Sequence, residues 1–182
     1  MELKRVVITG VGTVNPLGNS VEEFWKNLKN GVSGAGPITR FDPSKHKTQF
    51  ACEVKNFDAG EYIDRKEIRK HDLYTQFAYA ATEQAVVDSR LNLDQIDHDR
   101  VGVVWGAGIG GLQTFFEEAR NFENERPRFS PFFIPKMIAN IAGGVTFNQI
   151  RFPWAKLHSG FSLCISITCH DRSIHLDSVG QS

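Results

Sequence analysis

Short β-branched stretches alternate with amphipathic ones in the first part of the chain. Residues 4–9, Lys-Arg-Val-Val-Ile-Thr, predict a buried strand. Residues 10–18 are glycine-rich and predict a turn in which Asn15 or Pro16 fixes the backbone. Residues 20–30 predict a helix, where Ser20 and Glu23 have the spacing of a capping box. Its apolar positions recur at helical spacing and predict one packed face: Val21, Phe24, Trp25 and Leu28.

The same alternation continues through the middle of the chain. Residues 31–60 are rich in Gly and Pro and predict loops, with a short strand around Phe50–Val54. Asp72 opens a long predicted helix, whose alanines would let it approach another element closely. Residues 100–105, Arg-Val-Gly-Val-Val-Trp, predict a second buried strand. Strands that alternate with helices indicate an α/β layered fold.

Two further helices are predicted before the pattern changes. Residues 112–120 predict a charged surface helix. Ser130-Pro131 is a typical helix start, with proline at the first helical position. From Val145 the apolar positions fit neither a clean helix nor one continuous strand, although residues 161–168 alternate enough to form a strand.

Charge is distributed unevenly over the chain. The 182 residues hold 21 Lys and Arg against 21 Asp and Glu, so the formal net charge is zero. Residues 145–182 carry only five of those charges in 38 positions, but two of the three cysteines; the third, Cys52, is expected to be a core or near-core thiol. Balanced charge argues against nucleic acid as the main partner. No apolar run approaches the roughly 20 residues of a membrane span, and the apolar stretch at the start is too short for a signal peptide.

Gly106, Gly108 and Gly111 lie between a predicted strand and a predicted helix, with the spacing of a dinucleotide-binding fingerprint. That fingerprint also needs an acidic residue at the end of a second strand, about 20 residues further on. Glu123 and Glu125 stand at that distance, but in a polar loop with no strand before them. We therefore favour close backbone packing at a tight turn over a nucleotide site.

Cys164, Cys169 and His170 resemble a cofactor or metal motif only in composition. Four residues separate the cysteines, whereas a c-type haem site has two. His158 and His175 are too loosely arranged to complete a zinc site. A Cys–His nucleophile pair is conceivable, although only the residue types support it. We predict that none of these side chains carries a function.

Several segments of the first 144 residues have a familiar order and spacing. They are Arg5–Gly18 (RVVITGVGTVNPLG), Phe24–Leu28, Gly31–Gly34, Ile38–Asp42, Val101–Gly111 (VGVVWGAGIGG), Ser130–Pro135 and Met137–Gly144. Together they resemble the β-ketoacyl-acyl-carrier-protein synthases, condensing enzymes of the thiolase-like family, and synthase II most closely. The resemblance is highly specific and covers about four-fifths of the chain.

The resemblance implies a thiolase-like fold, layered αβαβα, of which this chain would be the incomplete N-terminal part. It implies a cytoplasmic homodimeric acyltransferase of fatty acid biosynthesis, with acyl- and malonyl-loaded acyl carrier protein as partners and no cofactor. The family's reaction is the decarboxylative Claisen condensation of an acyl-enzyme with malonyl-acyl carrier protein. A cysteine at a helix N-terminus, where its thiolate is favoured, takes the acyl chain, and two histidines in the second half assist the condensation.

The resemblance also assigns an acyl pocket. Ile109 would stand near that pocket, and Phe133 and Ile134 would reach toward the pocket of the second subunit; plain core and dimer packing is the alternative for each. Cys164 does not match the family's nucleophile, because leucine and isoleucine flank it where alanines are expected. Neither family histidine has a counterpart, so we assign no catalytic residue, and no cofactor-binding or metal-binding residue.

The resemblance ends at Val145. If every codon from Phe147 on is started at its second base, the chain can encode Gly-Phe-Arg-Gly-Pro-Asn in six consecutive positions and later Ser-Ala-Cys-Ala-Ser, as the family continues. We therefore divide the chain into residues 1–144, the N-terminal part of a synthase domain, and residues 145–182, a frameshifted tail. A genuine, divergent C-terminus is the alternative.

Activity and folding follow from this division. The chain as printed is expected to show no condensing activity and to fold poorly, because strands from a two-half core would leave apolar edges open. Two other function classes remain open: a non-enzymatic α/β interaction module in which the tail is genuine, and, less favoured, a dinucleotide-dependent oxidoreductase.

Overall fold

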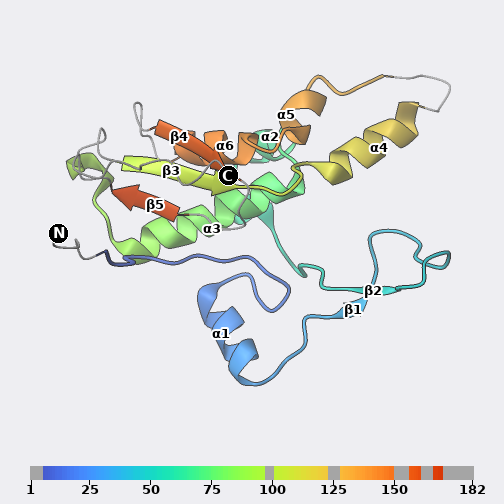
Figure 1. Ribbon diagram of the computed structural model, residues 1–182, viewed down its shortest axis with the longest axis horizontal. Helices are drawn as coiled ribbons and strands as arrows, with labels where there is room; N and C mark the ends of the chain where they lie inside the picture. Colours follow the sequence, from blue (N-terminus) through green and yellow to red (C-terminus); the bar gives the residue numbers. More distant parts are fainter. Residues whose placement is uncertain (1–5, 97–100, 123–127, 150–155, 161–165, 170–182) are drawn as a thin grey trace, which may run out of the picture. The chain divides into compact units, whose positions relative to one another are not determined.

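A computed structural model describes residues 6–96, 101–122, 128–149, 156–160 and 166–169 (Figure 1). The chain divides into two compact units. The first unit is Met1–Ile68 with Gln76–Leu91, and the second is Arg69–Thr75 with Asn92–Ser182. The described elements, in chain order, are α1 (Val21–Lys29), β1 (Gly36–Pro37), β2 (Phe50–Ala51), η1 (Ala59–Glu61), α2 (Arg65–Ile68), α3 (Leu73–Ser89), η2 (Leu93–Gln95), β3 (Val101–Gly106), α4 (Leu112–Phe122), α5 (Phe133–Met137), α6 (Ile141–Gln149), β4 (Lys156–Gly160) and β5 (Ser166–Cys169).

Helix α1 confirms the helix predicted in the first unit. Ser20 is its N-cap and accepts a hydrogen bond from the Glu23 N–H (3.2 Å). The Glu23 carboxylate reaches back to the N–H of Asn19 (2.8 Å) instead of that of Ser20, so the capping box closes one residue earlier than predicted. The predicted packed face is wrong for the residues that the structure describes: none in α1 is buried, and Trp25 is 55% exposed.

The strand predicted over residues 4–9 is wrong for the part that is described. Residues 6–14 form no strand, and Val6 and Ile8 are 82% and 86% exposed. A strand needs a neighbouring backbone for its N–H and C=O groups. No strand of the described ranges pairs with residues 6–10.

The segment that follows lies along α3 instead. The Val11 N–H donates to the Asp88 carboxylate (2.9 Å). A Cβ atom at Gly12 would lie 2.0 Å from the Ala81 carbonyl oxygen, so a larger residue could not take this place. The alanine-rich helix therefore allows the close approach that its sequence predicts.

Residues 10–18 end in the predicted turn. Asn15 and Gly18 exchange backbone hydrogen bonds of 3.0 and 3.1 Å. The Asn15 side-chain oxygen accepts from the Leu17 N–H (2.8 Å), an Asx-type turn in which asparagine holds the backbone.

Residues 31–60 are mostly loop, as predicted, with one antiparallel ribbon. β1 pairs with β2, so the strand predicted around Phe50–Val54 covers only Phe50–Ala51. Cys52 follows directly and is exposed. The prediction of a core thiol is therefore wrong, because a ribbon of two short strands has no interior in which to bury the residue after it.

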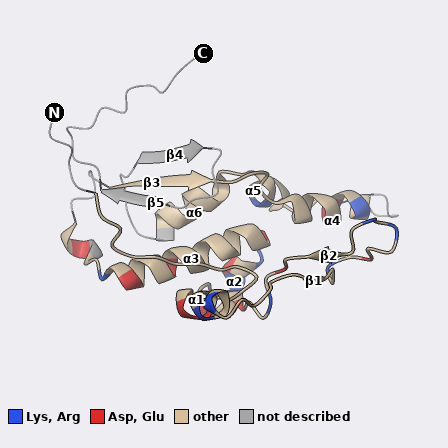
Figure 2. Cartoon of the chain, turned by 60° about the horizontal axis from the view of Figure 1, so that its bottom comes forward, with Lys and Arg blue, Asp and Glu red and all other residues tan. Residues whose placement is uncertain are grey.

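The second unit is built around β3. β4 pairs with it in parallel on one side and β5 antiparallel on the other, giving the order β4-β3-β5 (Figure 1). β3 carries no charged residue (Figure 2) and alternates in burial, with Val101, Val103 and Trp105 buried. This confirms the second buried strand. Helix α6 contacts β3 and β4, and α4 contacts α5.

Two boundaries in the second unit differ from the prediction. The helix expected to start at Ser130-Pro131 begins at Phe133, because the Ser130 hydroxyl and carbonyl oxygens first accept the N–H groups of Phe132 and Phe133 in a turn. α6 runs without a break across residue 145. Of the strand considered over residues 161–168, β5 covers 166–168, and residues 161–165 lie outside the described part.

Candidate functional site

The glycine-rich turn between β3 and α4 is tied to the C-terminal end of α5. Gly110 has a φ of +87°, which favours glycine. A Cβ atom there would lie 2.4 Å from the carbonyl oxygen of Met137. The Gly111 N–H donates to that same carbonyl (3.1 Å). Glycine is therefore required at position 110, and the turn is hydrogen-bonded to the end of α5 at the Met137 carbonyl.

A buried carboxylate lies beside this turn. Asp72 is 7% exposed, and its Oδ2 accepts from the Thr114 N–H (3.1 Å) and from the Thr114 hydroxyl. Its Oδ1 accepts from the Tyr74 N–H (3.1 Å). One side chain thus satisfies donors in the first turns of both α3 and α4.

Tyr74 extends the same set of contacts. Its hydroxyl donates to the Ile138 carbonyl oxygen (2.6 Å), immediately after α5. Burial raises the pKa of the Tyr74 phenol, and the nearby Asp72 raises it further. The hydroxyl therefore keeps its proton, and remains a donor, through the neutral pH range.

The structure places the three predicted acyl-pocket residues on this turn and on α5. Ile109 is 69% exposed at the tip of the turn, and Ile134 is 55% exposed on α5. Phe133 is half-buried and stacks on Phe129 and Phe115, with ring centroids 5.0 and 6.4 Å apart. The turn meets α5 through the backbones of Gly110 and Gly111.

The same geometry argues against the dinucleotide interpretation. A bound pyrophosphate would need the N–H groups at the start of α4. Those of Gly111 and Thr114 already donate to the Met137 carbonyl and the Asp72 carboxylate. The expected acidic partners, Glu123 and Glu125, lie outside the described residues.

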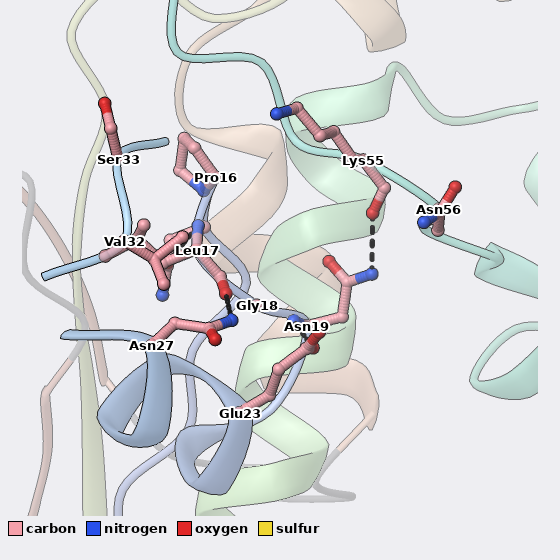
Figure 3. Close-up of a pocket in the computed structure, with 11 residues that line it drawn as sticks. Pro16, Leu17, Gly18, Asn19, Glu23, Asn27, Val32, Ser33, Lys55 and Asn56 are labelled. Atoms are coloured by element: carbon pink, nitrogen blue, oxygen red, sulfur yellow. Dashed lines mark hydrogen bonds between the residues drawn. The ribbon is translucent and has the colours of Figure 1, made fainter. Parts of the chain in front are cut away.

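A hollow of about 220 Å³ lies in the first unit, beside the turn at Asn15 (Figure 3). Its side-chain amides are engaged with the backbone: Asn27 donates to the Leu17 carbonyl (2.6 Å) and Asn19 to the Lys55 carbonyl (2.9 Å). These bonds hold α1 and the Lys55 segment around the turn. The hollow contains none of the three predicted site residues.

The cysteine and histidine residues of the tail are not brought into a described site. Cys164, His170 and His175 lie outside the described residues, and only the backbones of His158 and Cys169 are described, in β4 and β5. Among the described side chains, no three His, Cys, Asp or Glu residues form a group that could hold a metal ion. Within the same ranges, no helix is long and apolar enough to cross a membrane.

Sequence reasoning missed the pairing of Asp72 with Thr114. An aspartate before an apolar helix signals an N-cap, so the role of Asp72 at the start of α3 can be predicted from the sequence. Its second partner lies 42 residues away, and no local pattern points to it.

Comparisons with known proteins identify the family. Residues 3–149 match the family described as "Beta-ketoacyl synthase, N-terminal domain". Relatives named "3-oxoacyl-[acyl-carrier-protein] synthase 2" are 44% identical over 147 residues in Synechocystis sp. and 47% identical over 146 residues in Coxiella burnetii. Each alignment covers 80% of this chain and 35% of the relative, so the chain spans about a third of the length of these relatives.

Solved structures agree with this assignment. The ishigamide ketosynthase/chain length factor superimposes with a TM-score of 0.74 at 27% identity, over 85% of this chain and 39% of that one. A ketosynthase solved with its type II PKS acyl-carrier protein and a hexaketide gives 0.68 at 25% identity, over 86% and 41%. The described residues are thus the N-terminal part of a thiolase-like fold, and the chain belongs to the β-ketoacyl synthase family.

Proposed function

We propose that this chain is the N-terminal part of a 3-oxoacyl-acyl-carrier-protein synthase of fatty acid biosynthesis. The observation that carries the proposal is 43–47% identity, over 142–147 residues, to relatives of that name. In the proposed reaction malonyl-acyl carrier protein loses CO2, and the resulting carbanion attacks the carbonyl carbon of the acyl-enzyme thioester. The bond from that carbon to the enzyme sulfur breaks, and the sulfur takes up a proton. The products are 3-oxoacyl-acyl carrier protein, CO2 and the free enzyme thiol. We place this reaction in the cytoplasm.

The proposed acyl site uses the exposed apolar side chains of the second unit. Ile109 and Ile134 are each more than half exposed, and the stacked Phe133 directly precedes Ile134 in sequence. A contiguous exposed apolar patch marks a binding surface, and we propose that these side chains contribute to one. We propose that an acyl chain and a second copy of the protein cover this surface, as in a homodimer.

Acyl carrier protein is the proposed partner. One structurally similar ketosynthase was solved in complex with its acyl-carrier protein, and the curated relatives carry that protein in their names. Isotope-labelled acyl carrier protein titrated with a complete synthase that contains residues 1–149 is expected to show localised chemical-shift changes. An unchanged spectrum at a large excess of the synthase would contradict this partner.

The test of the activity is a pair of proteins. In one, residues 1–149 replace the matched segment of the Coxiella burnetii relative; the other is the 182-residue chain as printed. We expect the chimera to produce 3-oxoacyl thioester and the printed chain to give none above blank, since we assign it no catalytic residue. A folded, dimeric but inactive chimera beside an active unmodified relative would contradict the proposed function.

We also propose that the tail from residue 145 is read in a shifted frame. In support, the family match ends at residue 149, five residues into this tail, and leaves residues 150–182 unmatched. A genuine tail remains the alternative, and the pairing of β4 and β5 with β3 favours it. The nucleotide sequence of codons 143–165 distinguishes the two: the frameshift idea fails if no shifted frame there encodes Ser-Ala-Cys-Ala-Ser.

A further inference from the structure

The starts of α3 and α4 both donate hydrogen bonds to one buried carboxylate in the second unit. We propose that Asp72 is a positioning residue for the acyl site: it fixes the turn that carries Ile109 against α5, which carries Phe133 and Ile134. This inference rests on the acyl site proposed above. It adds a residue that touches no acyl chain but determines where the lining side chains stand.

Two routes of hydrogen bonds lead from Asp72 to α5. On the first, Asp72 accepts from Thr114 in the first turn of α4, which directly follows Gly111, and Gly111 donates to the Met137 carbonyl. On the second, Asp72 accepts from the Tyr74 N–H, and the Tyr74 hydroxyl donates to the Ile138 carbonyl. Both routes end on consecutive carbonyl groups at the end of α5, so they close a ring.

The chemistry of this position requires a carboxylate. Three donors face it: the N–H and hydroxyl of Thr114 and the N–H of Tyr74. An ionised carboxylate is an acceptor only, so both of its oxygens serve them. Its negative charge also lies at the N-termini of α3 and α4, where helix dipoles favour it. An asparagine here would turn its NH2 group toward either the Thr114 donors or the Tyr74 N–H. Those donors would then have no acceptor.

The space around Gly111 restricts the turn as well as the hydrogen bonds do. A Cβ atom at Gly111 would lie 2.1 Å from the Lys136 carbonyl oxygen and 3.1 Å from Asp72 Oδ2. Only glycine therefore fits between the end of α5 and the carboxylate at this point of the turn.

Nothing comparable holds the outer part of the turn. Ile109 is 69% exposed, and in the described part of the chain no atom beyond the neighbouring residues lies within 4 Å of a Cβ atom built on Gly108. The place of the Ile109 side chain consequently depends on Gly110 and Gly111, and through them on the ring of bonds around Asp72.

The test compares two carboxylates that accept backbone N–H groups near opposite ends of α3. Asp72→Asn changes the buried one, and Asp88→Asn changes the exposed one that accepts from Val11. Amide hydrogen exchange is measured on the 182-residue chain. For Asp72→Asn we expect exchange to rise roughly tenfold or more at Gly111 and Thr114. Exchange in β3 should stay unchanged, and Asp88→Asn should affect only residues around Val11.

Two results would overturn the proposal. One is an equal rise in exchange throughout β3, α4 and α6 in an Asp72→Asn variant that still folds, which marks a merely structural role. The other is an absence of protection at Gly111 and Thr114 in the unsubstituted chain, which means that the ring does not form.

A milder pair of variants covers the case in which Asp72→Asn fails to fold. Thr114→Val removes one donor to Asp72 and keeps the shape, whereas Thr114→Ser keeps the hydroxyl. We expect faster exchange at Gly111 in the valine variant and wild-type exchange in the serine variant. Equal exchange in both would contradict the proposal.

A separate measurement keeps this inference distinct from the proposed function. Binding of ¹³C-carboxyl dodecanoate to the unsubstituted 182-residue chain is followed by line broadening. If the probe does not bind while exchange still depends on Asp72, the acyl site fails and the positioning of the turn stands. If the probe binds Asp72→Asn as well as the unsubstituted chain, and hydrogen exchange is the same in both, the positioning role fails and the acyl site stands.

Discussion

Val6–Ile8 and Val101–Val103 are two short apolar segments of similar composition with opposite surroundings. Val6, Val7 and Ile8 are 82%, 61% and 86% exposed, whereas Val101 and Val103 are 4% and 0% exposed. The second segment lies between β4 and β5, which satisfy its backbone on both edges. The first pairs with no strand of the described residues. The side chains of a β-branched segment become core only where another part of the protein supplies the neighbouring backbone.

The largest difference in stability between the two segments should appear when a charged residue is placed in each. Val103→Asp places a carboxylate with no partner at a fully buried position, and we expect it to destabilise the second unit by several kcal/mol. Val7→Asp is the matched control, with an expected change of about 0.5 kcal/mol or less. Guanidinium unfolding followed by circular dichroism measures both. Similar losses from the two variants would mean that Val7 is buried in solution.

Substitution of a glycine after each of the two segments should give a stability difference of intermediate size, which sharpens the contrast. Gly12→Ala forces a Cβ atom into the Ala81 carbonyl, and we expect a loss of about 1–3 kcal/mol. The Cβ atom of Gly108→Ala meets nothing within 4 Å among the described residues, its chain neighbours aside, and the variant should leave stability almost unchanged. Thermal melts of the two variants provide the comparison. A neutral Gly12→Ala would show that residues 10–13 do not lie on α3.

A smaller effect is expected from the helix that follows the first segment. Ser20→Ala removes the side-chain cap of α1 and should cost about 1 kcal/mol. Ser33→Ala, which removes a hydrogen bond to the Ala35 N–H in an exposed loop, is the control and should cost less. Helical circular dichroism against denaturant measures both. If both losses are alike, the cap contributes no more than a loop contact.

The smallest effect concerns pH and the β1–β2 ribbon. The Thr39 hydroxyl donates to the exposed Glu53 carboxylate and holds its pKa below the ordinary value of 4.5. Since the folded pKa is depressed, this contact stabilises the ribbon above pH 4.5 and loses its effect as the pH falls through the folded pKa. An NMR titration of the Glu53 carboxyl should show a lowered midpoint that Thr39→Val restores. An ordinary midpoint in the unsubstituted chain would contradict the contact.

Local signals in the sequence predicted the elements that depend on local contacts. Ser20 and Glu23 mark the start of α1, and Asn15 marks the turn before that helix. Each of these side chains accepts a hydrogen bond from a residue no more than four positions away in the chain. The strand at residues 4–9 and the packed face of α1 were predicted from apolar patterns alone. Such patterns show what a segment can bury, and another part of the molecule decides whether it does.

The candidate site also has features that the sequence predicts and features that depend on tertiary structure. The three acyl-pocket residues came from resemblance to a family, and their chemistry remains a proposal. Asp72 was visible as the start of a helix, but its bond to Thr114 spans 42 residues and depends on tertiary structure. Cys52 was assigned to the core by residue type, and the ribbon that carries it is too small to have one.

The two described tryptophans provide an optical consequence of this architecture. Trp25 belongs to the first unit and is 55% exposed, whereas Trp105 ends β3 in the second unit and is 7% exposed. Trp105 should therefore emit at shorter wavelength and shift toward red when the second unit unfolds, while Trp25 should change little. With Trp154 replaced by Phe, a single emission spectrum would report on each half of the molecule through its own fluorophore.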